Sequence, residues 1–463
     1  MMINIFQKFN LSALFVMVCF AFSAGADAQS KKDQKRAKQL VEQGDKLFRQ
    51  KDYRNALDQY SQAVVLVPNN GYAHFWKGYA HYYLKENDLA LAELDLALMQ
   101  KYKPAEVYKV RWFVNYEAKN YDSALEDINK LRELEPGYTD FMLALGDIYF
   151  GKGAYRDALV PYQNAVLKYP ENGDLFLNLA KVQFNLGDTA GQGSAAENAI
   201  RKGAQSLGEA YYYLGDARQK ERRFPEAMVA YQKSLTAKPE QYEVYRNLSE
   251  LYRASSRIEE AIEVSKRGLR LFPNDGNIYT DLSWFYSLSD RHEDAVQAAL
   301  AGIRFAPTQP MAYTNLCRAY NDSKKPELAI TACNNALKLS PNDGETNFYL
   351  GRSNALLGRE AKASEFYKKS IVGLTAFTAS NPDYSDGFYL LGNAYFEDGQ
   401  HAKAAVAYKR SLELNPRFVK ARFNMGIISV ILKNKPVAMQ QYDSLLSLNK
   451  NLADKLKAEI DKL

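Results

Sequence analysis

One alanine recurs at a fixed spacing along almost the whole chain of 463 residues. It falls at Ala56, Ala90, Ala124 and Ala158, then at Ala227, Ala261, Ala295, Ala329 and Ala363, and finally at Ala404 and Ala438. Most intervals are 34 residues, while one is two periods plus one residue and another is 41 residues. A period between about 20 and 50 residues is typical of a solenoid, in which each repeat buries its apolar face against its neighbours. The sequence therefore predicts a repeat array.

The apolar residues inside one repeat have a helical spacing. Tyr245, Leu248 and Tyr252 fall at i, i+3 and i+7, which places them on one face of a first helix. Ala261 and Gly268 lie on one face of a second helix, where small side chains allow the two helices to approach closely. Each repeat is thus predicted to be a helix-turn-helix pair.

The order of residues within a repeat resembles that of the tetratricopeptide repeat (TPR) family. The pattern is most complete at Leu145-Gly146, Tyr149, Ala158, Tyr162, Ala165 and Pro170. The resemblance covers residues 37–452 and implies an all-α fold, an α-solenoid that is a right-handed TPR superhelix of about 12 helix-turn-helix repeats. It also implies a concave groove that is lined by the first helices and binds partners.

The period is interrupted twice. Residues 187–207 are rich in glycine, and seven residues are inserted at 371–384. Seven residues are close to two helical turns, so a second helix can lengthen there without rotating its apolar face. Residues 453–463 are predicted to be a helix that caps the last repeat. We expect one continuous array with a flexible joint near Gly187–Gly203.

Residues 1–28 are predicted to be a cleaved secretory signal peptide. Lys8 precedes an apolar run at 11–24, and Ala26 and Ala28 supply the small residues before the cleavage site. The run is short for a transmembrane helix, although an uncleaved anchor and a lipid anchor at Cys19 are alternatives. We therefore expect the protein to be exported to the periplasm of a Gram-negative-type bacterium. Association with the outer membrane is an open alternative.

A basic linker is expected at 29–36, directly after the predicted cleavage site. Its basic residues are Lys31, Lys32, Lys35 and Arg36. The linker is interpreted as a soluble tail, with contact to an anionic membrane surface as the alternative. No transmembrane segment is expected once the signal has been removed.

The residue types do not compose a catalytic or metal site. His74 and His81 are seven residues apart, whereas helical zinc pairs are usually four apart. The glycines at 191–196 lack the preceding strand of a dinucleotide loop. A net charge of +6 is mild for a chain of this length. We therefore expect no enzyme activity, no metal, no cofactor and no nucleic acid.

Two cysteines follow the predicted signal peptide, Cys317 and Cys333. Both occupy inward positions on the two helices of one repeat, and an exported protein meets an oxidising compartment. A disulfide between them is one interpretation. The alternative is that each is a small apolar residue that fills the core.

The positions beside the packing stripe predict the residues of the groove. In the second and third repeats they are aromatic: Phe75, Tyr79, Tyr82, Tyr83, Phe113 and Tyr116. In the later repeats they are Arg246, Asn247, Arg253, Trp284, Asn315, Arg318, Asn321 and Arg352. Aromatic anchors, backbone-binding amides and carboxylate-binding arginines suit a peptide ligand. Stacking between neighbouring repeats is the alternative for the aromatic residues, and asparagine at these positions is common in the family.

The sequence thus predicts a non-enzymatic scaffold or adaptor. It would be exported and would bind protein or peptide partners through its concave groove, within a multiprotein envelope assembly. The alternative function is binding of envelope polysaccharide through the same aromatic and asparagine side chains.

Overall fold

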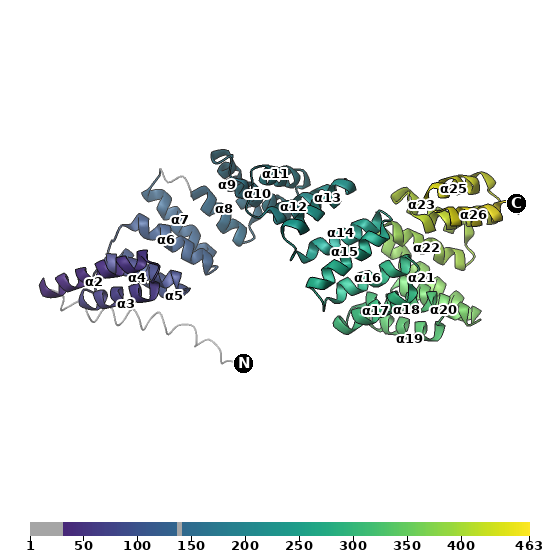
Figure 1. Ribbon diagram of the computed structural model, residues 1–463, viewed down its shortest axis with the longest axis horizontal. Coiled ribbons are helices and arrows are strands. Elements are labelled where there is room, and N and C mark those ends of the chain that lie inside the picture. The colour runs from purple at the N-terminus through teal and green to yellow at the C-terminus, as the bar shows by residue number, and fades with distance from the viewer. Residues whose placement is uncertain (1–30, 137–140) are drawn as a thin grey trace, which may run out of the picture. The chain divides into compact units, whose positions relative to one another are not determined.

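The computed structural model describes residues 31–136 and 141–463, in which every regular element is an α-helix (Figure 1). The predicted signal peptide at 1–28 lies outside the described residues. The 25 helices of the described part form twelve consecutive pairs and one final helix. The predicted all-α solenoid is confirmed. Among these helices, none has the length and apolar character needed to cross a membrane.

The chain forms two compact units, which divide between Gln205 and Ser206. Unit 1 contains five helix pairs. They are α2 (Lys31–Arg49) with α3 (Tyr53–Leu66), α4 (Gly71–Tyr83) with α5 (Asn87–Met99), α6 (Pro104–Glu117) with α7 (Tyr121–Leu134), α8 (Phe141–Gly151) with α9 (Tyr155–Lys168), and α10 (Gly173–Leu186) with α11 (Thr189–Arg201).

Unit 2 contains seven helix pairs and the final helix. They are α12 (Leu207–Lys220) with α13 (Phe224–Ala237), α14 (Tyr242–Ala254) with α15 (Ile258–Leu271), α16 (Gly276–Leu288) with α17 (His292–Phe305), α18 (Pro310–Asp322) with α19 (Pro326–Leu339), α20 (Gly344–Leu356) with α21 (Glu360–Ser380), α22 (Ser385–Glu397) with α23 (His401–Leu414), α24 (Val419–Ile431) with α25 (Lys435–Leu448), and lastly α26 (Lys450–Ile460).

The ladder alanines lie in the tightest part of each pair. Each of the eleven has 2% or less of its surface exposed. They all stand on second helices, which pack closely against the first helices. A larger side chain at these positions would push the two helices apart, which explains why the alanine recurs with the period.

Several first helices are capped by the polar residue that follows a proline turn. The side chain of Asn70 accepts a hydrogen bond from the backbone nitrogen of Ala73 at 3.1 Å. Asp275 accepts in the same way from Ile278 at 2.7 Å. Each cap satisfies a backbone N–H that has no partner inside the helix, and so fixes where the helix begins.

A glycine on the first helix faces a tyrosine on the second helix in several repeats. The pairs are Gly44–Tyr60, Gly146–Tyr162, Gly215–Tyr231, Gly351–Tyr367 and Gly392–Tyr408, each 16 residues apart. A Cβ added to Gly351 would lie 2.7 Å from Cδ1 of Tyr367. The ring therefore occupies the space that the missing side chain leaves.

Cys317 and Cys333 occupy these same two positions in another repeat. They stand 34 residues before Gly351 and Tyr367. The structure records a disulfide between them, with Cα atoms 5.2 Å apart. Both residues are fully buried. The bond therefore replaces the glycine–tyrosine contact of the neighbouring repeats.

The inserted residues lengthen one second helix, as the sequence predicts. Helix α21 has 21 residues, whereas α19 in the preceding repeat has 14. The added turns reach the next repeat, where the rings of Phe377 and Tyr384 lie 5.8 Å apart. A Cβ on Gly387 would lie 3.0 Å from the Phe377 ring. The insertion thus packs against the start of α22.

The structure differs from the predicted boundaries at both ends of the array. Helix α2 begins at Lys31, so the basic residues assigned to a linker at 29–36 belong to its first turns. Lysine, glutamine and alanine favour a helix, and Asp33 lies in its first turn. The capping helix begins at Lys450 rather than at residue 453, because Asn449 caps it by accepting from the Leu452 nitrogen at 3.0 Å.

The middle of the array contains the segment in which a joint is predicted, near Gly187–Gly203. The glycine-rich segment at 187–207 is mostly helix α11, which is capped by Asp188. The Asp188 side chain accepts from the Gly191 nitrogen at 3.0 Å, and Ala196 and Ala199 are fully buried. The boundary between the two units follows this helix, after Gln205.

Candidate functional site

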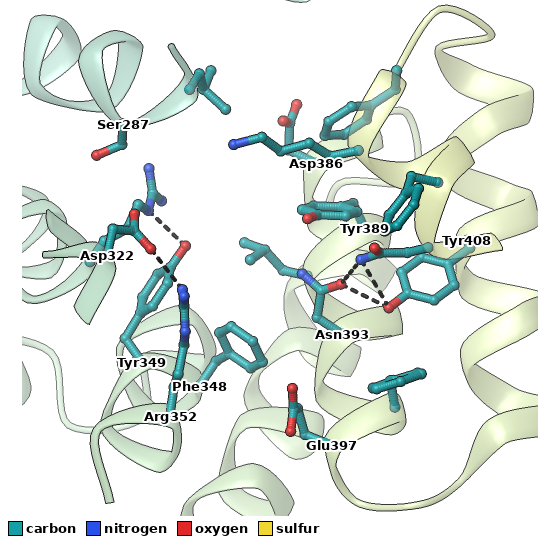
Figure 2. A pocket seen from close by; sticks show the side chains of 18 of the residues that line it. Ser287, Asp322, Phe348, Tyr349, Arg352, Asp386, Tyr389, Asn393, Glu397 and Tyr408 are labelled. Atoms are coloured by element: carbon teal, nitrogen blue, oxygen red, sulfur yellow. Dashed lines mark hydrogen bonds and ion pairs between the residues drawn. The ribbon is translucent and has the colours of Figure 1, made fainter. Parts of the chain in front are cut away.

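The first helices of the last five repeats surround a cavity of about 410 Å³ in unit 2. We call it the inner pocket. Helices α16, α18 and α20 supply one wall, and α22 and α24 supply the other. Figure 2 shows Tyr349 and Arg352 on one side, with Tyr389 and Asn393 facing them across the cavity. Its volume lies in the range of pockets that hold small ligands.

Arg318 is the most constrained cation of the inner pocket. Its Nε donates to the Tyr349 hydroxyl at 2.7 Å, and its guanidinium pairs with Glu345. Only 8% of the side chain is exposed, yet Nη1 has no hydrogen-bond partner. A buried N–H without an acceptor is costly, so a ligand that brings an acceptor to Nη1 would gain more than an ordinary hydrogen bond.

Arg352 is the more accessible arginine of the same wall. Its Nη1 lies 2.8 Å from Asp322 Oδ1, and 41% of its side chain is exposed. Burial lowers the pKa of Arg352, but the charge of Asp322 outweighs burial and leaves the pKa above its ordinary value. The guanidinium therefore stays charged while part of it faces solvent.

The opposite wall contains a network of neutral polar groups beside its charged residues. Asn393 Oδ1 accepts hydrogen bonds from the Tyr408 hydroxyl at 2.8 Å and from Asn424 Nδ2 at 2.9 Å. Burial raises the pKa of Tyr389 and of Tyr408, so both phenols stay protonated. This wall offers amides and hydroxyls, which can pair with the backbone of a bound chain.

Apolar side chains and acidic groups complete the lining. The apolar residues are Leu288, Phe348, Leu390, Phe396, Phe418, Phe423 and Ile427. Asp386 and Glu397 lie on the α22 wall. Burial raises the pKa of Glu397, and the Arg352 charge opposes this only in part. The inner pocket thus combines both signs of charge with a large apolar surface.

The lining residues repeat the register of the array. One position holds Trp284, Arg318, Arg352, Asn393 and Ile427, at successive steps of 34, 34, 41 and 34 residues. The sequence prediction included the first three residues of this series but missed the last two. Continuing the series through the 41-residue step would have found them. The register therefore identified three of the residues that line the inner pocket, Trp284, Arg318 and Arg352.

The inner side of unit 2 is closed by a contact between distant helices. Arg253 at the end of α14 lies 3.0 Å from Asp386 at the start of α22, 133 residues later. Only 6% of the Arg253 side chain and 8% of the Asp386 side chain are exposed. Burial lowers the pKa of Arg253, but Asp386 and Glu250 outweigh it and raise the pKa overall. The guanidinium also covers the Trp284 ring, 4.3 Å from its centroid.

Four further polar contacts join the ends of α12, α14 and α16 to the segment 383–420. Asn415 Nδ2 donates to the Ala254 carbonyl at 3.2 Å, and Ser256 Oγ donates to the Arg417 carbonyl at 3.3 Å. The ion pairs are Arg222–Asp383 at 3.1 Å and Lys420–Asp290 at 3.6 Å. We call these four contacts together with Arg253–Asp386 the clasp.

Two of the predicted groove asparagines are structural rather than exposed to a ligand. Asn315 is 2% exposed and donates to the Thr280 carbonyl at 2.9 Å. Asn321 is 1% exposed and donates to the Tyr349 carbonyl at 3.1 Å. Both amides link neighbouring first helices, which satisfies buried carbonyl groups. Neither of these two predicted residues lines the inner pocket.

The other predicted polar residues lie outside the inner pocket. Arg246 pairs with Asp281 at 2.9 Å, and Asn247 lies beside the Tyr231 hydroxyl. Arg253 belongs to the clasp. Only Trp284, Arg318 and Arg352 of the predicted set line the pocket.

The predicted aromatic residues of unit 1 lie close together on α4 and α6. We call Phe75, Tyr79, Tyr82, Tyr83, Phe113 and Tyr116 the aromatic surface. Phe75 is only 6% exposed and belongs to the core, whereas Tyr83 and Phe113 are 41% and 37% exposed. Burial raises the pKa of Tyr79, which is packed beside Tyr83 with ring centroids 5.2 Å apart.

The rings of the aromatic surface mostly contact one another. Tyr53 stacks on Tyr83 with centroids 4.3 Å apart, and Tyr82 meets Phe113 edge to face at 5.7 Å. Such ring pairs stabilise the packing of consecutive repeats. The alternative interpretation of these aromatics, as contacts between neighbouring repeats, is therefore the one that the ring geometry favours.

The histidines of α4 are held by carboxylates. His74 Nδ1 lies 2.6 Å from Glu93, and Lys77 pairs with the same carboxylate at 2.6 Å. His81 Nδ1 lies 2.7 Å from Glu86. In residues 31–136 and 141–463, no three histidine, cysteine, aspartate or glutamate side chains are arranged to hold a metal ion.

Four family models that describe the tetratricopeptide repeat match parts of this chain. The matched residues are 44–85, 115–168, 212–276, 312–343 and 385–418. The chain is a tetratricopeptide-repeat solenoid. The TPR matches fall in both units, and those at 312–343 and 385–418 each fall on one helix pair, α18 with α19 and α22 with α23.

Relatives share short segments with this TPR chain. A UDP-N-acetylglucosamine–peptide N-acetylglucosaminyltransferase of Giardia intestinalis is 32% identical over 80 residues, which are 17% of this chain and 5% of the relative. The photosystem I assembly protein Ycf3 of Acaryochloris marina is 36% identical over 74 residues, 15% of this chain and 45% of the relative. This chain therefore spans less than half the length of either relative. Yeast Tom70 is similar in structure, with a TM-score of 0.40 and 13% identity over 92% of this chain and 94% of Tom70.

Proposed function

We propose that this protein is a non-enzymatic TPR adaptor that binds a segment of a partner polypeptide in the inner pocket. The observation that carries the proposal is Arg318, whose Nη1 is buried and unpaired among the lining groups of a cavity of about 410 Å³. A peptide carbonyl or carboxylate would supply the missing acceptor.

The composition of the inner pocket favours a polypeptide over a polysaccharide. A peptide brings apolar side chains as well as amides, and the lining offers both apolar rings such as Phe396 and polar groups such as Asn393. Two asparagines that could bind sugar hydroxyls, Asn315 and Asn321, donate hydrogen bonds to carbonyls of neighbouring helices instead. The exposed rings of the aromatic surface contact one another, so fewer ring faces are open for stacking on sugars.

We further propose that the adaptor works in the cell envelope. The predicted signal peptide at 1–28 supports export, and the disulfide between Cys317 and Cys333 suits an oxidising compartment. Fractionation of cells that express the full chain tests this proposal. Recovery of the protein in the cytoplasm with residues 1–28 still attached would contradict it.

A photo-crosslinking experiment tests the binding proposal. A benzophenone amino acid is placed at Phe396, which lines the inner pocket, and in a matched control at Phe224, which is 39% exposed and does not line it. Irradiation of intact cells should link discrete polypeptides to position 396 and not to position 224. Equal products at both positions, or products only with glycans, would contradict the proposal.

A further inference from the structure

One charged side chain of the inner pocket has no ion-pair partner. The lining contains six charged residues, and five of them are paired. The pairs are Arg318–Glu345, Arg352–Asp322, Asp386–Arg253 and Lys420–Asp290. The sixth is Glu397, and no lysine, arginine or histidine of the described residues lies within ion-pair distance of it. Figure 2 shows its carboxylate extending from α22 toward the space between the two walls.

The repeat register explains why Glu397 has no partner. Asp322 ends α18 and Glu397 ends α22, at equivalent positions once the steps of 34 and 41 residues are followed. Asp322 pairs with Arg352, which follows it by 30 residues on the next first helix. The residue 30 positions after Glu397 is Ile427 on α24, which also lines the inner pocket. An isoleucine cannot neutralise a carboxylate, so the cation that completes the pair in the earlier repeat is missing here.

A bound chain could supply this cation. Glu397 is exposed, so a partner can reach it from solvent. Burial raises the pKa of Glu397, and the charge of Arg352 offsets this only in part. A positive charge beside the carboxylate would favour its ionised form. The methylene groups of a lysine or arginine could pack against the apolar lining, which includes Phe348 and Phe396.

We infer that the partner segment carries a lysine or arginine whose charge pairs with Glu397, as Arg352 pairs with Asp322. The cations of the inner pocket already have carboxylate partners, so an acidic segment would compete with existing ion pairs. A basic residue at Glu397 breaks no contact, and a carbonyl of the same segment can accept from Arg318 Nη1. This inference rests on the proposed function and specifies the chemical class of the partner.

Selection from a library of short random peptides tests the inference. Wild-type protein and Glu397→Gln are used in parallel, because glutamine keeps the shape of the side chain and removes its charge. The wild type should enrich peptides with lysine or arginine at a fixed position, and E397Q should lose this enrichment. The control is Glu413→Gln, which removes an exposed carboxylate from α23 outside the inner pocket and should select the same peptides as the wild type.

A double-mutant cycle measures the pair directly. Replacing the basic residue of a selected peptide by glutamine should weaken binding to the wild type by about tenfold, because the bound chain excludes water from the pair. The same replacement should change binding to E397Q by less than about twofold. Equal losses with the two proteins would show that the basic residue does not contact Glu397.

A second variant supplies the missing cation from the protein itself. Ile427→Arg places an arginine at the position that Arg318 and Arg352 hold in earlier repeats, so the helix pair can accommodate it. It should weaken binding of the basic peptide by about tenfold more than binding of the glutamine form. Ile431→Arg adds the same charge on α24 at a residue that is 44% exposed and lies outside the lining, and it should leave both affinities within about threefold. Equal losses of the two peptides with I427R would contradict the register argument.

Failure of the inference and failure of the proposed function give different results. If selected peptides crosslink from position 396 but show no basic residue, or if E397Q keeps the basic preference, the inference is overturned and the proposed function survives. If no peptide is enriched, or if none of the enriched peptides crosslinks from position 396, the proposed function itself fails.

Discussion

Units 1 and 2 are built from the same type of helix pair, but the side chains on their first helices make different contacts. In unit 1, Lys85 of one repeat pairs with Glu117 of the next, and aromatic rings on α4 and α6 fill the space between neighbours. In unit 2, Arg253 instead reaches Asp386, 133 residues further along the chain. The helix pairs are alike, so this difference between the units lies in the side chains beside the packing stripe.

The largest expected effect is on the clasp of unit 2. Asp386→Ala leaves the Arg253 guanidinium buried with only Glu250 as an anionic partner, which should cost about 3 kcal/mol of stability. Hydrogen exchange should accelerate in α14 and α22 and stay unchanged in unit 1. Asp383→Ala is the control, since its pair with Arg222 is exposed and should contribute at most about 1 kcal/mol. Equal effects of the two variants would show that the clasp adds little.

The disulfide should give unit 2 a sensitivity to reductant that unit 1 lacks. Its half-cystines are 16 residues apart, and closing a loop of this size stabilises by about 3 kcal/mol. Cys317→Ser with Cys333→Ser should therefore lower the resistance of unit 2 to urea by about that amount. Cys317→Gly with Cys333→Tyr restores the contact seen at Gly351 and Tyr367, and should recover part of the stability without any response to dithiothreitol. A wild-type protein unaffected by dithiothreitol would contradict the prediction.

Unit 1 should instead respond to pH through Glu93. Burial raises the pKa of Glu93, but hydrogen bonds from His74 and Lys77 outweigh burial and hold the pKa below its ordinary value of 4.5. A lowered carboxylate pKa stabilises the fold above pH 4.5, and this stabilisation is lost as the pH falls through the folded-state pKa. Glu93→Gln should thus cost about 2 kcal/mol at pH 7, and the difference should fade below pH 4.5. Urea unfolding of unit 1 over this pH range measures it; a constant difference would count against the assignment.

The smallest effect is expected on the aromatic surface. Phe113→Ala removes edge contacts with Tyr82 and Trp112, whose ring centroids lie 5.7 and 5.4 Å away, and should cost about 1 kcal/mol. Crosslinking from position 396 should be unchanged. If this variant leaves stability intact but removes partners in a pull-down, the aromatic surface is a contact site and both units bind partners.

The repeat period made most of the fold predictable. The ladder alanines, the helix-turn-helix pairs and the longer α21 all follow from spacing, because close packing at one position of each repeat requires a small side chain. The capping helix was placed correctly to within a few residues, and its start depended on Asn449, whose capping role the apolar stripe does not reveal.

The clasp was beyond the reach of the same reasoning. Arg253 and Asp386 meet because small rotations between successive repeats accumulate over four repeats, and no local pattern records their sum. The unit boundary after Gln205, in contrast, lies next to the joint predicted near Gly187–Gly203, although most of that segment is helical. Arg318 and Arg352 were found from their register, whereas Asn393 was missed because the longer step before it was not followed.

The exchange of Gly351–Tyr367 for Cys317–Cys333 at equivalent positions has a practical consequence. A buried tyrosine ring and a disulfide thus occupy the same position in neighbouring repeats of this solenoid, and each joins the two helices of its pair. A disulfide could therefore be engineered by replacing Gly392 and Tyr408 with cysteines. The choice of repeat would set which part of the solenoid is covalently stiffened.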